Sequence, residues 1–74
     1  MWQTVVIDAV KRLCQRHKTS VFTRQMLIDE ELQQIIVKTR TSAKPAQTMS
    51  RVLQELRDQG FIEFVDNGGT YHLL

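Results

Sequence analysis

The C-terminal stretch constrains the fold of this chain more than any other part. Residues 62–65 and 70–73 are two short runs rich in apolar and aromatic side chains, and they flank Asn67-Gly68-Gly69. An Asn-Gly pair between two such runs favours a type I′ turn, because both central residues tolerate positive φ. The sequence therefore predicts a β-hairpin, and Gly60 just before it is typical of the residue that ends a helix.

The turn also predicts which residues pair across the hairpin. With Asn67 and Gly68 at its centre, one face of the hairpin is apolar or aromatic and the other is largely polar. A shift of one residue would mix the two faces, so the sequence specifies this register, although Gly69 leaves room for a longer loop with a bulge. The predicted pairs are Ile62 with Leu73, Glu63 with His72, Phe64 with Tyr71, Val65 with Thr70, and Asp66 with Gly69.

Helical spacing predicts a first helix over about residues 3–17. Its apolar stripe is Trp2, Val6, Ala9, Val10 and Leu13, and His17 continues it. Val5 and Ile7 lie outside this narrow stripe, so we expect them to contact a neighbouring element or a partner domain.

A second helix is predicted over residues 24–37, with Thr23 as its N-cap. Ile28, Leu32, Ile35 and Ile36 share one face, whereas Met26 and Leu27 do not fit it, so a break near residues 29–31 is expected. Val21 and Phe22 form a strand too short to stand alone, and they can pair with the hairpin.

A third helix follows the polar segment 38–44, which we interpret as a loop. Pro45 suits the first turn of a helix, and Ser42 is a plausible cap. The apolar stripe of this helix is narrow and consists of Met49, Val52, Leu53 and Leu56.

The order helix, short strand, helix, helix, strand, strand indicates a winged helix-turn-helix. This fold class is mainly α, with three helices and a small antiparallel sheet that ends in the hairpin. A chain of 74 residues is long enough for a single domain, residues 1–74, with a small core.

Charge is distributed unevenly along the chain. No Asp or Glu lies between Gln33 and Gln54, yet Lys38, Arg40, Lys44 and Arg51 fall there. Such a local basic stretch suits a polyanion, although a solvated surface would look the same.

The face of the third helix opposite its apolar stripe would be free to probe double-stranded DNA. At about 100° per residue, Gln47 and Arg51 point that way, and they can pair with adenine and guanine. Nearby cations and hydroxyls suit phosphates. The hairpin tip would make weak contacts or reach the minor groove only through Asn67, and turn formation alone also explains its residues. The residues expected to contact DNA are Lys38, Arg40, Thr41, Ser42, Lys44, Gln47, Thr48, Arg51 and Asn67.

Catalysis and metal binding find little support in the sequence. Cys14, His17 and His72 could in principle hold zinc, but there is no cysteine pair and His17 extends an apolar stripe. We expect no catalytic residues, no metal, no cofactor and no small-molecule substrate. The single cysteine and the lack of a long apolar run predict a cytoplasmic protein that does not contact membranes.

The stretch MSRVLQELRDQGFIEFVDNGGTYHLL, Met49 to Leu74, resembles the C-terminal winged-helix domain of Dam-replacing-type restriction endonucleases. Upstream, Phe22, Thr23 and Leu32 are similar to that family's second helix. Residues 40–48, RTSAKPAQT, depart from the family pattern, which leaves target sequence and methyl dependence open. The matching C-terminal residues are Leu53, Gln54, Leu56, Arg57, Asp58, Gly60, Ile62, Glu63, Phe64, Gly69 and Tyr71.

The resemblance implies a non-catalytic module that recognises target DNA for a bacterial restriction endonuclease, with the nuclease in a separate N-terminal domain. Two alternatives remain at this point. One is a small transcriptional regulator that binds a palindromic site as a homodimer through Val5 and Ile7. The other is a winged helix that binds protein.

Overall fold

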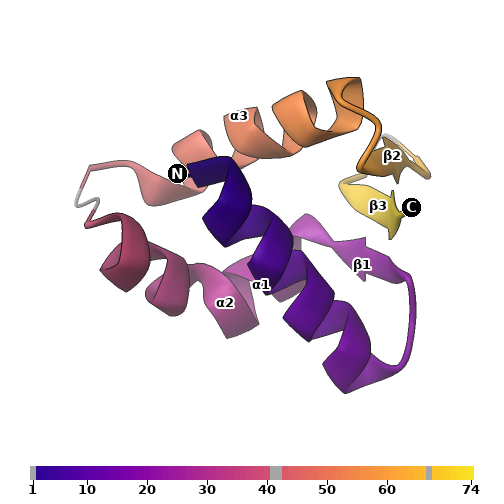
Figure 1. Ribbon diagram of the computed structural model, residues 1–74, viewed down its shortest axis with the longest axis horizontal. Helices are drawn as coiled ribbons and strands as arrows, with labels where there is room; N and C mark the ends of the chain where they lie inside the picture. Colours follow the sequence, from indigo (N-terminus) through magenta and orange to yellow (C-terminus); the bar gives the residue numbers. More distant parts are fainter. Residues whose placement is uncertain (1, 41–42, 67) are drawn as a thin grey trace.

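The structure is a computed structural model that describes residues 2–40, 43–66 and 68–74. Within these residues three helices and a three-stranded antiparallel sheet occur in the predicted order (Figure 1). This arrangement confirms the winged-helix fold class. The elements are α1 (Trp2–His17), β1 (Val21–Thr23), α2 (Arg24–Thr39), α3 (Pro45–Asp58), β2 (Ile62–Phe64) and β3 (Thr70–Leu73).

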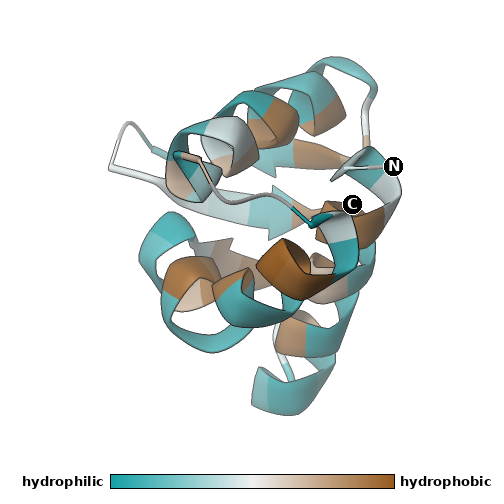
Figure 2. Ribbon diagram, turned by 90° about the vertical axis from the view of Figure 1, so that its left-hand side faces the viewer, coloured by the Kyte–Doolittle hydropathy of each residue, from teal (hydrophilic) through white to brown (hydrophobic). Residues whose placement is uncertain are grey.

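The core lies between the three helices and one face of the sheet. Hydrophobic positions alternate with hydrophilic ones along the helices (Figure 2), and apart from Glu31 the buried positions of the described helices are apolar. Each fully buried apolar side chain of this kind contributes roughly 1.5–3 kcal/mol. The predicted stripes of α1 and α3 are confirmed, because their apolar members from Val6 to Leu13 and from Met49 to Leu56 are buried.

The apolar residues of α1 that are not fully buried also pack within the chain. Trp2, from the predicted stripe, and Val5 and Ile7, from outside it, are partly buried against the core. Of the two contacts expected for Val5 and Ile7, a neighbouring element or a partner domain, the contact within the chain is confirmed. His17 does not extend the apolar stripe as predicted, because it is exposed and its Nε2 lies 2.8 Å from Glu30 Oε2.

The predicted break in α2 is wrong, since the helix runs without interruption from Arg24 to Thr39. Its buried stripe is Leu27, Glu31 and Ile35, spaced by four residues, so a carboxylate occupies a core-facing position. Helix α2 also extends into the segment predicted as a loop. The Thr39 hydroxyl donates to the Ile35 carbonyl at 2.7 Å.

The helix ends follow simple capping rules. The Thr23 hydroxyl accepts from the Met26 amide at 3.0 Å, which confirms the predicted N-cap of α2. At the end of α3, Gly60 has φ +88°, and the amides of Gly60 and Phe61 donate to Arg57 and Leu56. This is a Schellman motif, which explains the glycine.

At the start of α3 the prediction is only half confirmed. Pro45 lies in the first turn, as expected. The N-cap position is Lys44 rather than Ser42, and no side chain caps the helix there. Ser42 itself lies outside the described residues.

The sheet has the predicted register. Ile62, Glu63 and Phe64 pair with Leu73, His72 and Tyr71, and the Val65 amide donates to the Thr70 carbonyl at 3.0 Å. The turn prediction falls on Asn67, which lies outside the described residues. Strand β1 pairs with the other edge of β3, so β3 is the central strand.

The core-facing side of the sheet is aromatic. The Tyr71 ring lies between Phe22 and Phe64, with ring centroids 5.4 Å and 5.2 Å away. Phe64 is still 41% exposed, because it lies on an edge strand near the C-terminal end of α3. This aromatic row joins the hairpin to the helical core. No described helix has the length and apolar character to cross a membrane.

Candidate nucleic-acid interface

The outer face of α3 is where the sequence predicts it. Burial of Met49, Val52, Leu53 and Leu56 fixes the rotation of the helix. The opposite face is therefore turned to solvent, and all its members are exposed: Gln47, Arg51, Gln54 and Asp58. Two of them, Gln47 and Arg51, are the residues predicted to read bases.

A basic end adjoins this face. Lys38 and Arg40 stand at the end of α2 and Lys44 at the start of α3, and all three are exposed. These helix ends lie together at the end of the molecule away from the sheet (Figure 1). Arg40 and Lys44 have φ of +55° and +49°, a left-handed conformation that costs residues with a Cβ roughly 1–2 kcal/mol. The chain thus turns sharply at both ends of the connection, which keeps its cations beside the first turn of α3.

Other predicted contact residues are placed less favourably. Thr48 is only half exposed, and its hydroxyl donates weakly to the Lys44 carbonyl at 3.4 Å. That contact tightens the first turn of α3. Thr41, Ser42 and Asn67 lie outside the described residues.

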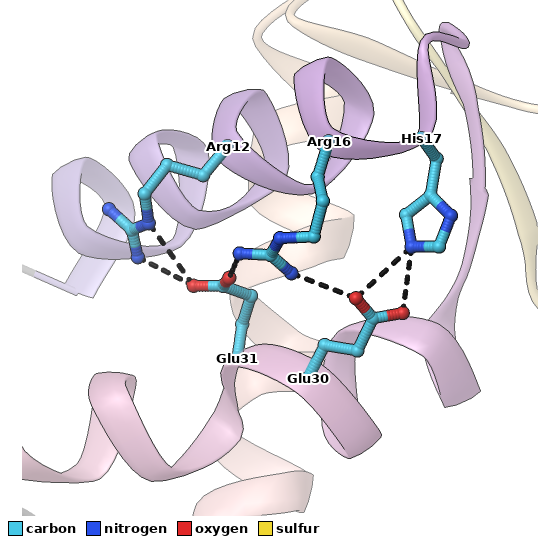
Figure 3. Close-up of polar contacts among 5 residues, drawn as sticks. All are labelled: Arg12, Arg16, His17, Glu30 and Glu31. Carbon is cyan, nitrogen blue, oxygen red and sulfur yellow. Dashed lines mark hydrogen bonds and ion pairs between the residues drawn. The ribbon is translucent and has the colours of Figure 1, made fainter.

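The cations near α3 differ from those between α1 and α2. The Arg12 and Arg16 guanidinium groups both bind the Glu31 carboxylate at 2.7 Å, and Glu30 binds Arg16 and His17 (Figure 3). By contrast, no ion pair among residues 2–40, 43–66 and 68–74 involves the basic groups of the predicted interface: Lys38, Arg40, Lys44 and Arg51. Their charge is available to a polyanion.

The ion-pair network also shifts the pKa of its acids. Burial alone would raise the pKa of Glu31, but hydrogen bonds from Arg16 and Arg12 outweigh it and the pKa is lowered. Hydrogen bonds from Arg16 and His17 likewise lower the pKa of Glu30. Both carboxylates are held ionised, as expected for groups that hold two helices together.

Sequence reasoning missed two arginines beside the hairpin. Arg24 opens α2, and its Nε donates to the Ser50 hydroxyl of α3 at 2.6 Å. Arg57, near the end of α3, lies over the Phe64 ring, 4.3 Å from its centroid. A weak signal existed for Arg57, since Ser50 and Arg57 are seven residues apart and share one flank of the helix. No local pattern joins Arg24 to Ser50.

Two of the groups weighed for catalysis, Cys14 and His72, are buried or paired within the fold. Cys14 is buried, and burial raises the pKa of its thiol, which disfavours a nucleophile. His72 Nδ1 lies 3.0 Å from Glu63, which is the predicted cross-strand pair. The described residues form no pocket, and among them no cluster of His, Cys, Asp and Glu could hold a metal.

Comparison of the chain with protein-family models, with curated proteins and with solved structures finds no match. The resemblance to Dam-replacing endonucleases therefore stays a prediction from the residues quoted above.

Proposed function

We propose that this domain binds double-stranded DNA by inserting α3 into the major groove. The observation that carries the proposal is the outward rotation of α3, which exposes Gln47 and Arg51. They lie beside a basic end whose cations form no ion pair among the residues that the structure describes. A recognition helix contacts base edges through its N-terminal half. On α3 that half holds Gln47 and Arg51 and no acidic residue, whereas both acids of the helix, Glu55 and Asp58, come later.

The proposed roles follow from side-chain chemistry. Gln47 and Arg51 read bases, because a side-chain amide can form bidentate hydrogen bonds with adenine and a guanidinium group can form them with guanine. Lys38, Arg40 and Lys44 hold phosphates, which supplies affinity without sequence information. The remaining predicted contacts, Thr41, Ser42, Thr48 and Asn67, would position the duplex.

The resemblance at the C-terminal end supports a more specific role. We propose that the domain is the non-catalytic target-recognition module of a bacterial restriction endonuclease that acts in the cytoplasm and carries its nuclease elsewhere. One module of this size buries only about 600–1,000 Å² on DNA, so isolated binding would be weak and strongly dependent on salt. A small transcriptional regulator would need a dimer interface, and Val5 and Ile7 pack inward instead.

Protein binding is the second candidate, and the outer face of the sheet favours it. Val21 lies opposite His72. Phe61 directly precedes β2 and Val65 directly follows it, each two residues from Glu63. Leu74 completes this face, whose four apolar members are 42–63% exposed. Exposed apolar groups gathered on one face are typical of protein contacts.

Fluorescence anisotropy distinguishes these functions. Wild-type protein is titrated against duplex pools, unmethylated and adenine-methylated, at about 50 and 200 mM salt. The proposal predicts binding that weakens steeply with salt and an enriched target sequence. Binding that is the same at both salts, or no binding at all, would contradict it and leave protein binding as the favoured function.

The Lys44→Ala variant, measured in the same titration, tests the proposed phosphate contact of Lys44. Alanine also carries a Cβ, so the backbone strain at position 44 is kept while one cation is removed. Every duplex should bind more weakly, and the slope of log affinity against log salt should fall by about one. A loss confined to certain sequences would contradict the phosphate role of Lys44, and Lys11→Ala, an exposed lysine on α1, serves as the control.

A further inference from the structure

The hairpin presents a puzzle for a DNA-binding winged helix, because residues 61–74 contain no Lys or Arg. Asp66 lies near the turn, and its Oδ1 accepts from the Gly68 amide at 2.7 Å. A phosphate strand would find no cation on the hairpin itself. Any attraction on this side of α3 must therefore come from neighbouring elements.

Two arginines, Arg24 and Arg57, supply positive charge there. They belong to a group of residues where α2, α3 and the hairpin meet, which we call the wing-side seam: Arg24, Ser50, Arg57, Phe64, Gly69 and Tyr71. Arg24 joins three elements at this seam. Its amide donates to the Gly69 carbonyl at 2.8 Å, and its Nε donates to Ser50 Oγ at 2.6 Å. Ser50 Oγ in turn donates to the Ala46 carbonyl at 3.1 Å, which leaves its lone pairs for Arg24. The guanidinium is thus held in a fixed place between α3 and the hairpin.

Most N–H donors of the Arg24 guanidinium have no acceptor among the described residues. A guanidinium has five N–H donors, and within the described residues only Nε of Arg24 donates to a side chain. No carboxylate in that part of the chain pairs with Arg24. A guanidinium group with free N–H donors can form bidentate hydrogen bonds with a phosphate.

Arg57 is the second cation of the seam. Its guanidinium lies 4.3 Å from the centroid of the Phe64 ring, an orientation that cation–π attraction favours. Its Nη2 also lies 3.2 Å from Asp58, whose side chain is 68% exposed. A pair between exposed neighbours is weak, so a phosphate oxygen can displace Asp58.

Tyr71 lies near both cations. Its ring is packed between Phe22 and Phe64 and the residue is 6% exposed. Burial raises the pKa of the Tyr71 hydroxyl, while the nearby charges of Arg24 and Arg57 oppose that rise. Arg24 and Arg57 thus both lie near the Tyr71 hydroxyl, so their charges act on the same part of the seam.

We propose that Arg24 and Arg57 bind phosphodiester oxygens of the DNA strand that passes between α3 and the hairpin. The inference rests on the proposed function and adds a second phosphate site to it. The first site, Lys38, Arg40 and Lys44, lies at the opposite end of the molecule from the sheet (Figure 1). Ser50, which holds Arg24, follows Lys44 by six residues, or roughly 9 Å along α3, and Arg57 follows Lys44 by thirteen residues, or roughly 20 Å. The two sites therefore lie at different positions along α3 and would hold different phosphates.

The salt dependence of duplex binding tests this site. Arg24→Gln and Arg57→Gln should each lower the slope of log affinity against log salt by about one, with the preference among sequences unchanged. Arg24→Lys keeps the charge and should keep the slope, and Lys11→Gln removes a cation from the exposed face of α1 and should also keep it. If wild-type protein binds DNA while both glutamine variants retain the wild-type slope, the seam proposal is wrong and the proposed function stands.

Ser50→Ala separates charge from packing. It removes the hydrogen-bond partner of Arg24 but leaves the guanidinium, so the slope should stay at the wild-type value even where the melting temperature falls. A slope that falls as far in Ser50→Ala as in Arg24→Gln would show that the effect comes from packing, and would overturn the site. Failure of wild-type protein to bind any duplex overturns the proposed function and this inference together.

Discussion

The two sides of this molecule use arginine in opposite ways. Between α1 and α2, Arg12 and Arg16 form ion pairs with Glu31 and Glu30 (Figure 3). Around α3, the cations at positions 38, 40, 44 and 51 have no ion-pair partner in the described part of the chain. Net charge alone, +2, would not distinguish the two sides. The difference teaches that the position of the carboxylates, rather than the number of cations, decides which surface can attract a polyanion.

The largest expected effect concerns the ion pairs between α1 and α2. Glu31 is 2% exposed and accepts from two arginines, so Glu31→Ala should lower the free energy of unfolding by about 2–4 kcal/mol. Glu30→Ala, which removes the more exposed acid of the same network, should cost clearly less. Urea denaturation measures both variants. Equal losses would show that burial of Glu31 does not set the strength of this contact.

Low pH should weaken the same ion pairs and lower the stability of the fold. The pKa values of Glu30 and Glu31 are lowered in the folded state, so their stabilisation is complete above the ordinary glutamate pKa of 4.5. It is lost as the pH falls through their lowered folded-state values. Melting temperatures between pH 7 and pH 3 should therefore drop in wild-type protein and drop less in a Glu30→Gln, Glu31→Gln double variant. Parallel curves for the two proteins would contradict the assignment.

A smaller effect is expected on the α3 side, in binding and not in folding. Arg51→Ala should reduce the discrimination between target and non-target duplexes by about 1–3 kcal/mol and change stability by less than about 0.5 kcal/mol. Arg16→Ala is the matched control, which should lower the melting temperature and leave discrimination intact. If Arg16→Ala alters discrimination as much as Arg51→Ala, the two sides are not functionally distinct.

The smallest expected effect is a gain. Asp58 lies on the outer face of α3 and pairs with Arg57 at 3.2 Å. Asp58→Asn removes a negative charge beside the proposed phosphate strand, so every duplex should bind more tightly, by up to about 1 kcal/mol. Anisotropy titrations at low salt provide the measurement. Weaker binding would show that Asp58 holds Arg57 in its useful position.

Local patterns were enough to predict the hairpin and α3. The register of β2 and β3 follows from a period of two and a turn signal, and the buried stripe of α3 follows from a period of 3.6. The outward direction of Gln47 and Arg51 could be inferred from that stripe alone. These predictions need no knowledge of any other element.

Contacts between distant residues account for the failures. The break expected near residues 29–31 came from Met26 and Leu27, which did not fit the predicted apolar face. The buried stripe instead runs from Leu27 through Glu31, whose burial two arginines of α1 make tolerable. Likewise, Arg24 reaches Ser50 across 26 positions of sequence, so the wing-side seam could not be found before the fold. His17 was misassigned for the same reason, since its partner Glu30 belongs to another helix.

Backbone amide NMR of the folded domain tests the central claim most directly. A target duplex is added stepwise and the shifts of assigned amide signals are followed. Our account predicts the largest changes along the outer face and N-terminal end of α3, around Gln47 and Arg51, with little change over Arg12 and Arg16. Changes concentrated between α1 and α2 or on the outer face of the sheet, with α3 unaffected, would contradict it.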